Sequence, residues 1–225
     1  ARGTDMPDWD TSLVTEMNHM FYQKDHFDQN IGGWDVSRVT NMMIMFSRAF
    51  AFNGDISNWN TGAVIYMYNM FGYATTFNQD LSAWNVARVT DMTFMFGFAR
   101  NFNQAITNWD VSSVTDMESM FRGATMFDQA ITGWDVSEVT NMRLMLADTS
   151  FNQALTGWDV RRVTDMSHMF RRSRYFDHDL SGWNVALVTD MQNMFDSATA
   201  FNQDITGWTL KDTSVIVTDM FTGAT

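Results

Sequence analysis

The sequence predicts an α/β solenoid of nine 25-residue turns, each with a short parallel strand and a short helix. Two observations predict this fold class: the regular recurrence of tryptophan and the spacing of apolar residues within each period. The tryptophans are 25 residues apart, with one interval of 24, at Trp9, Trp34, Trp59, Trp84, Trp109, Trp134, Trp158, Trp183 and Trp208. Such periods are typical of stacked units that bury their apolar faces only against neighbours. We therefore expect one elongated domain over residues 1–225, with atypical turns at both ends.

The helix is expected in the segment that follows each Trp. Counting positions from the Trp, apolar residues fall at 5, 8, 11, 12 and usually 15, as at Val39, Met42, Met45, Phe46 and Ala49. This spacing is that of one apolar stripe on a short helix. A threonine before the stripe, such as Thr40, can cap free amides, and Thr115 to Glu118 has the spacing of a capping box. A helix of about three turns is marginal alone, so packing between turns must stabilise it.

The strand is expected before each Trp, around an aliphatic residue. Residues 127–131 read Phe-Asp-Gln-Ala-Ile, and Ile or Leu recurs at 31, 56, 81, 106, 131, 155, 180 and 205. Gly or Asn often precedes the Trp, as at Gly133 and Asn108, which indicates a corner. Strands of successive turns would pair in parallel about 4.8 Å apart, giving a rod of about 40 Å.

Composition disfavours several classes of function. The formal net charge of −12 argues against nucleic acid as a partner, because phosphate binding needs clustered Lys and Arg. No apolar run approaches the roughly 20 residues that cross a bilayer, so we expect no membrane-spanning segment. The absence of cysteine excludes disulfides and thiolate metal sites.

The repeat Phe-Asn-Gln-Asp-Ile-Ser-x-Trp-Asp-Val-Ser-x-Val-Thr-Asp-Met-x-x-Met-Phe-x-x-Ala resembles the BspA-like surface-protein repeat, which also occurs in surface lipoproteins, over nearly the whole chain. The resemblance implies a fold similar to leucine-rich-repeat solenoids. It also implies an extracellular or cell-surface adhesion or binding role without enzymatic activity. It carries over no functional residues, because the shared residues are structural. The chain departs from the pattern at Ile65-Tyr66, at Gly54 and at a one-residue deletion before Phe151.

Catalysis needs unlike groups that converge in a cleft, whereas here the same polar groups recur in every turn. The four histidines do not cluster, since His19 and His168 share a repeat position but lie six turns apart. No pairing of a nucleophile with a base and no dense set of metal ligands is visible. We therefore expect no enzyme, no catalytic residue and no cofactor.

A column of acidic residues follows the tryptophans. Stacking would bring consecutive copies about 5 Å apart, and carboxylate oxygens are ligands for calcium. The weak calcium candidates are Asp110, Asp135 and Asp159. The favoured alternative is that these side chains accept hydrogen bonds from turn amides and face water.

Function in a repeat protein is expected where the template varies. Position 10 should lie outermost, yet it holds Ile44, Phe94 and Leu144 in three turns. With nearby outward residues, these form a candidate protein-binding patch of Ile44, Tyr66, Tyr68, Tyr73, Phe94, Phe98 and Leu144. Scattered surface hydrophobes explain the same residues equally well.

A cluster of arginines is the second anomaly in this acidic chain. The arginines concerned are Arg143, Arg161, Arg162, Arg171, Arg172 and Arg174. They could dock an anionic protein or a lipid headgroup surface. The alternative is a solvated face balanced by Asp148, Asp159 and Asp165.

The sequence thus indicates a non-enzymatic, protein-binding repeat module, for cell-surface recognition or adhesion, that offers a preformed extended surface. The alternative is a fixed structural subunit or spacer of a larger multiprotein assembly. A third hypothesis is a calcium-stiffened rod.

Overall fold

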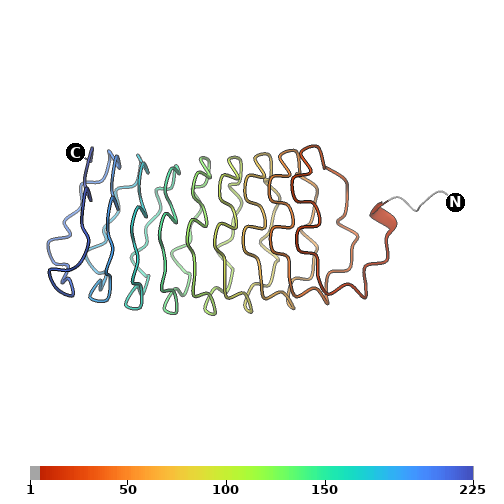
Figure 1. Ribbon diagram of the computed structural model, residues 1–225, viewed down its shortest axis with the longest axis horizontal. Helices are drawn as coiled ribbons and strands as arrows, with labels where there is room; N and C mark the ends of the chain where they lie inside the picture. The colour runs from red at the N-terminus through yellow and green to blue at the C-terminus, as the bar shows by residue number, and fades with distance from the viewer. Residues whose placement is uncertain (1–5, 225) are drawn as a thin grey trace.

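The computed structural model describes residues 6–224. Each repeat forms one loop, and the loops are stacked in chain order along a single axis (Figure 1). The first and last repeats consequently lie at opposite ends of an elongated body. One parallel bridge joins each repeat to the next, through Glu16, Asn41, Tyr66, Asp91, Asp116, Asn141, Asp165, Asp190 and Ile216. The 25-residue period of the sequence is therefore the period of the structure.

The helices expected in every repeat are wrong. Over residues 6–224 the only helix is the 3-10 helix η1 (Met6–Asp8). The amide of Ile44 donates to the carbonyl of Tyr68 in the next repeat at 2.9 Å, and Ser47 closes a tight turn onto the Ile44 carbonyl at 3.1 Å. Alternate amides thus bond to the neighbouring repeat, where a helix would direct them four residues back. No helix in the described part of the chain is long and apolar enough to cross a membrane.

The backbone explains why no helix forms. Positions 10 and 14 of the first eight repeats have a positive φ, between 52° and 68°, and in the last repeat the corresponding residues are Asp219 and Gly223, one position later. This left-handed conformation ends a right-handed helix after a single turn. Threonine has a different role from the expected cap, because the Thr40 hydroxyl donates to the Thr15 carbonyl at 3.3 Å. The expected capping box is also absent, since the Glu118 amide donates to Asp116 Oδ1 at 2.8 Å.

The strands expected around the Ile and Leu column are wrong as well, because β pairing in residues 6–224 is limited to the isolated bridges. Side chains connect the repeats there. The amide of Asn78 donates to Asn53 Oδ1 at 2.8 Å, and the amide of Asn103 donates to Asn78 Oδ1 at 2.9 Å. Trp59 Nε1 donates to the Ile31 carbonyl at 3.2 Å. Side-chain groups thus replace the backbone ladder of a sheet, and the α/β fold class is corrected.

The core is built from columns of identical residues. Within one repeat the rings of Phe46 and Phe52 stack at 3.9 Å, and Phe46 stacks on Phe71 of the next repeat at 5.5 Å. Trp59 and Trp84 stack at 6.2 Å. The predicted burial of the Trp and Met columns is confirmed for the inner repeats. None of the residues at positions 10 and 14 belongs to this core cluster, and apart from the buried Leu144, Ser119 and Gly123 they reach the surface at least in part.

Candidate functional site

The positive-φ positions carry the variation that distinguishes one repeat from another. Several repeats have Asn, Asp, Ser or Gly there, residues that suit or tolerate the left-handed region. The large apolar residues at these positions are Ile44, Phe94 and Leu144 at position 10, and Tyr73 and Phe98 at position 14. Bulky side chains at positive φ are outliers, and Ile44 is β-branched in addition. Apart from Leu144, these residues lie in three consecutive repeats.

Four side chains from successive repeats form a continuous column. The rings of Tyr73 and Phe98 stack at 4.8 Å with an interplanar angle of 7°. The guanidinium of Arg48 lies 5.4 Å from the Tyr73 ring centroid, and that of Arg122 lies 5.4 Å from the Phe98 centroid. Phe94 packs at an angle beside this column, with ring centroids 5.5 Å from Tyr73 and 5.9 Å from Phe98. Stacking and cation–π attraction therefore order these surface side chains.

Two glycines make room for the rings. A Cβ at Gly97 would lie 2.5 Å from Phe94 Cδ1, and a Cβ at Gly123 would lie 2.5 Å from Phe98 Cδ1. Gly123 also has a φ of +68°. Phe94 and Phe98 therefore lie directly on backbone that carries no side chain. The aromatic residues and the glycines beneath them form one local arrangement.

The residues of the predicted apolar patch differ in how far they reach the surface. Tyr66 is 46% exposed, whereas Ile44, Tyr68, Tyr73, Phe94 and Phe98 are half-buried. Leu144 is only 5% exposed, so it is not part of an exposed patch. Tyr68, Tyr73 and Phe94 line a shallow pocket of about 480 Å³ together with Glu118. We name as the aromatic surface the set Ile44, Tyr66, Tyr68, Tyr73, Phe94 and Phe98.

The predicted arginine cluster divides among different positions of the repeat. Arg161 and Arg162 occupy positions 3 and 4 after Trp158, whereas Arg171, Arg172 and Arg174 occupy positions 13, 14 and 16. Five of the six arginines pair with carboxylates: Arg143 with Glu118, Arg161 with Asp159, Arg162 with Glu138, Arg171 with Asp196, and Arg172 with Asp148. The six therefore do not form one patch.

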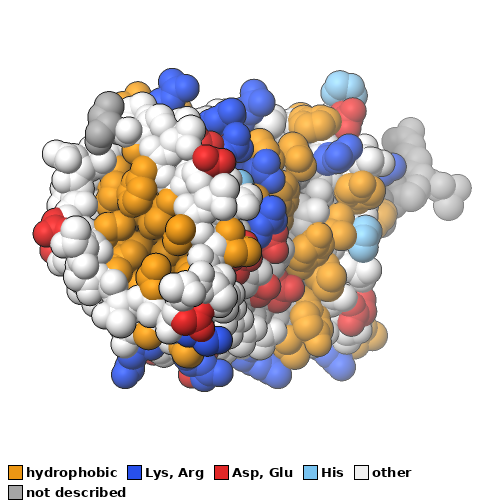
Figure 2. Space-filling model, turned by 60° about the vertical axis from the view of Figure 1, so that its left-hand side comes forward, with side chains coloured by type: hydrophobic (Ala, Val, Ile, Leu, Met, Phe, Trp, Pro, Cys, Tyr) orange, Lys and Arg blue, Asp and Glu red, His pale blue; other side chains and the backbone are white. Residues whose placement is uncertain are grey.

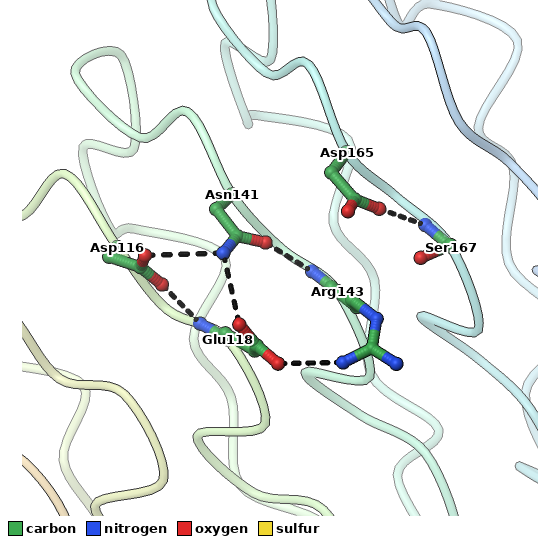
Figure 3. A network of polar contacts seen from close by, with 6 residues as sticks. All are labelled: Asp116, Glu118, Asn141, Arg143, Asp165 and Ser167. Carbon is green, nitrogen blue, oxygen red and sulfur yellow. Dashed lines mark hydrogen bonds and ion pairs between the residues drawn. The ribbon is translucent and has the colours of Figure 1, made fainter. Parts of the chain in front are cut away.

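Arg143 belongs to a closed polar network (Figure 3). Its Nη1 donates to Glu118 Oε1 at 2.8 Å. Asn141 Nδ2 donates to Asp116 Oδ2 at 3.1 Å and to Glu118 Oε2 at 3.3 Å, while Asn141 Oδ1 accepts the Arg143 amide at 3.0 Å. The charge of Arg143 is thus already balanced within the protein.

Sequence reasoning missed two arginines that the structure brings beside Arg171 and Arg172. Arg100 and Arg122 line a depression of about 420 Å³ with Phe98, Asp148 and both of these residues. A second depression of about 490 Å³ contains Arg172, Arg174 and Tyr175. Figure 2 shows Lys and Arg side chains gathered between the C-terminal end of the stack and an area of hydrophobic side chains. The signal in the sequence was the shared repeat position, 13 to 16, and not proximity along the chain.

The calcium candidates hold tight turns. Asp110 Oδ1 accepts from the Ser112 amide at 3.1 Å and from its hydroxyl at 2.6 Å. These bonds, the hydroxyl first, hold the pKa of Asp110 below its ordinary value. Asp135 accepts from the Ser137 amide at 3.0 Å, and Asp159 accepts from Arg161. No group of three His, Cys, Asp or Glu within residues 6–224 could hold a metal ion.

His168 is a half-buried histidine at position 10 of its repeat. Burial lowers its pKa, and the nearby charges of Arg143 and Arg171 lower it further, against Asp190 and Asp165. Its Nδ1 is buried without a hydrogen-bond partner.

The stacked loops and their repeated contacts define the chain as a repeat protein. The comparison with family models gives the same result. The chain belongs to the repeat family described as "Mycoplasma protein of unknown function, DUF285", whose model matches residues 1–105, 82–150 and 129–225. No curated protein and no solved structure matches the chain.

Proposed function

We propose that this chain is a non-enzymatic repeat module that binds a protein partner through the aromatic surface. The observation that carries the proposal is the placement of bulky apolar residues on left-handed backbone at Ile44, Tyr73, Phe94 and Phe98. An L-residue in this conformation costs about 1–2 kcal/mol, and such strain clusters at functional sites. The core does not need these side chains, because they lie outside it.

The composition of the aromatic surface supports a protein as the partner. Aromatic residues and arginine are enriched at the centres of protein interfaces, and rings that are already ordered lose little entropy on binding. The formal net charge of −12 argues against nucleic acid. Catalysis needs unlike groups that converge in one cleft, whereas the same polar side chains recur in successive repeats of this chain. This repetition supports a binding role over a catalytic one.

The proposal includes where the chain acts and whether it recognises a partner or forms part of an assembly. The resemblance to the BspA-like surface-protein repeat supports an extracellular or cell-surface recognition or adhesion module. The alternative is a fixed subunit or spacer of a multiprotein assembly, which would also need an ordered apolar surface. A partner bound in constant stoichiometry through purification would favour the assembly over recognition.

Affinity capture from the source organism tests the proposal. The bait is the unchanged chain, compared with a variant carrying Phe94→Ser and Phe98→Ser, with partners identified by mass spectrometry. The matched control is Leu187→Ser, which removes an apolar side chain that is 52% exposed outside the aromatic surface. We expect the double variant to lose a partner that the control retains. The melting temperatures of both variants are compared with that of the unchanged chain, so that unfolding is excluded as the cause. A partner set that is the same for all three baits would contradict the proposal.

A further inference from the structure

A groove lined with arginine adjoins the aromatic surface at Phe98. Two depressions, of about 420 and 490 Å³, share Thr125, Asp148 and Arg172 and so form one continuous hollow. Its basic side chains come from three repeats. We name as the arginine groove the set Arg100, Arg122, Arg171, Arg172 and Arg174.

The positive charge of the arginine groove is only partly balanced. Arg171 Nε lies 2.9 Å from Asp196 Oδ2, and Arg172 Nη1 lies 3.8 Å from Asp148 Oδ1. Arg100, Arg122 and Arg174 form no ion pair among residues 6–224. An excess of positive charge is therefore concentrated in one hollow of a protein whose net charge is −12. Such a local field attracts anionic groups.

Arg122 is held in place but lacks a polar partner. Its guanidinium lies over the Phe98 ring, 5.4 Å from the centroid, and its Nε is buried with no hydrogen-bond acceptor. A buried donor that is left unpaired destabilises the folded protein, and a charged donor does so more strongly. An oxygen anion in the groove would supply the missing acceptor. Arginine favours carboxylates because its planar donors match two oxygens at once.

We propose that the arginine groove binds a short acidic peptide segment, rich in Asp or Glu, of the protein partner. This inference rests on the proposed function, because it assigns the charge of the partner that docks on the aromatic surface. Apolar side chains of the partner contact the aromatic surface, and its carboxylates pair with Arg122, Arg172 and their neighbours. The groove thereby adds charge specificity to an apolar contact.

The geometry favours a peptide over a sugar or a nucleobase. Sugars and bases bind aromatic side chains by stacking on a free ring face. Tyr73 has Phe98 on one face and Arg48 near it, and Phe98 has Tyr73 and Arg122 as its stacking partners. The ring faces in this column are thus occupied within the protein. A long polyanion would also extend beyond the groove onto the acidic remainder of the surface.

Fluorescence anisotropy with the purified full chain tests the inference. The probe is fluorescein-labelled octaglutamate, with octaglutamine as the uncharged control peptide. The first variant combines Arg122→Gln and Arg172→Gln. The matched control combines Arg38→Gln and Arg88→Gln, which removes the same charge from exposed side chains at position 4. At 0.15 M salt we expect the groove variant to raise the Kd at least about tenfold and the control less than about twofold.

A second variant guards against loss of folding. Arg100 and Arg174 are exposed and unpaired in the described part of the chain, so Arg100→Gln with Arg174→Gln should leave the melting temperature unchanged. We expect this pair also to weaken octaglutamate binding severalfold. Equal weakening by groove and control variants would overturn the inference, as would tighter binding of a heparin fragment than of octaglutamate.

The experiment separates this inference from the proposed function. Octaglutamate has no apolar side chains, so Phe94→Ser alone should leave its Kd unchanged. If octaglutamate fails to bind while the Phe94→Ser and Phe98→Ser variant still loses its captured partner, only the acidic segment is refuted. If octaglutamate binds through the groove while the captured partners do not change, the aromatic docking surface is refuted.

Discussion

At the scale of single residues, the aromatic surface depends on what lies beneath it. Gly123 combines a left-handed backbone with a Cβ position 2.5 Å from the Phe98 ring, whereas nothing lies within 4 Å of a Cβ at Gly133. The surroundings therefore require glycine at position 123, whereas position 133 has room for a larger residue.

We predict that Gly123→Ala destabilises the protein by about 1–3 kcal/mol, since the methyl group collides with Phe98 and left-handed alanine is strained. Gly133→Ala should be neutral or stabilising by about 0.5 kcal/mol, because it restricts the unfolded chain. Urea denaturation measures both free energies of unfolding. Equal effects of the two substitutions would mean that the close contact with Phe98 does not matter.

At the scale of the element, the tight-turn segment shows why the sequence was misinterpreted. Inward residues at positions 8, 11, 12 and 15 have the spacing of a helical stripe. Consecutive tight turns with left-handed residues at positions 10 and 14 place the same residues inside. Apolar spacing alone cannot distinguish the two, because both bring every third or fourth residue to one side. Ile44, which disfavours positive φ, further concealed the left-handed position.

The candidate site was half predictable for a related reason. Phe94 and Tyr73 break a template that the sequence displays plainly, so the aromatic surface could be identified. Arg100 and Arg122 could not be found by adjacency along the chain, because the groove collects residues from different repeats at similar positions. Such a site is found when the repeats are aligned and residues at the same repeat position are compared. A search for residues that are close together along the chain misses it.

The polar ladder at position 19 is the element that replaces a strand. The side-chain oxygen Oδ1 of Asn78 accepts a hydrogen bond from the backbone amide of Asn103 at 2.9 Å. The backbone amide of Asn78 in turn donates to Oδ1 of Asn53 at 2.8 Å. We predict that Asn78→Ala costs about 1–3 kcal/mol in the free energy of unfolding, because it leaves the Asn103 amide without an acceptor.

Asn78→Asp is the matched control for that prediction. It keeps the acceptor oxygen, and Asp128 fills the same position while accepting the Asn152 amide at 2.8 Å. We expect it to retain most of the stability in the same urea titration at pH 7. Loss of stability as large as that of Asn78→Ala would show that the acceptor is not what the position requires.

At the scale of the whole molecule, the stack repeats one acidic turn many times. Asp35, Asp110 and Asp204 each accept from a hydroxyl and an amide two residues on, which holds the pKa of each below its ordinary value of 3.8. A folded-state pKa below the unfolded one contributes stability above the unfolded pKa, and this contribution is lost as pH falls through the folded pKa. The exposure of these groups makes each contribution small, but their number along the stack makes it cumulative.

We predict that acid weakens these turns, and that asparagine removes the effect. Asn85 accepts the Ala87 amide at 3.1 Å in the same turn without a titratable group. A variant with Asp35→Asn and Asp110→Asn should therefore unfold at nearly the urea midpoint of the unchanged chain at pH 7. Below about pH 4, where the unfolded carboxyls take up protons first, the midpoint of the unchanged chain should fall relative to the variant. Parallel curves for the two proteins down to pH 3 would mean that the lowered pKa values contribute nothing to the stability of the stack.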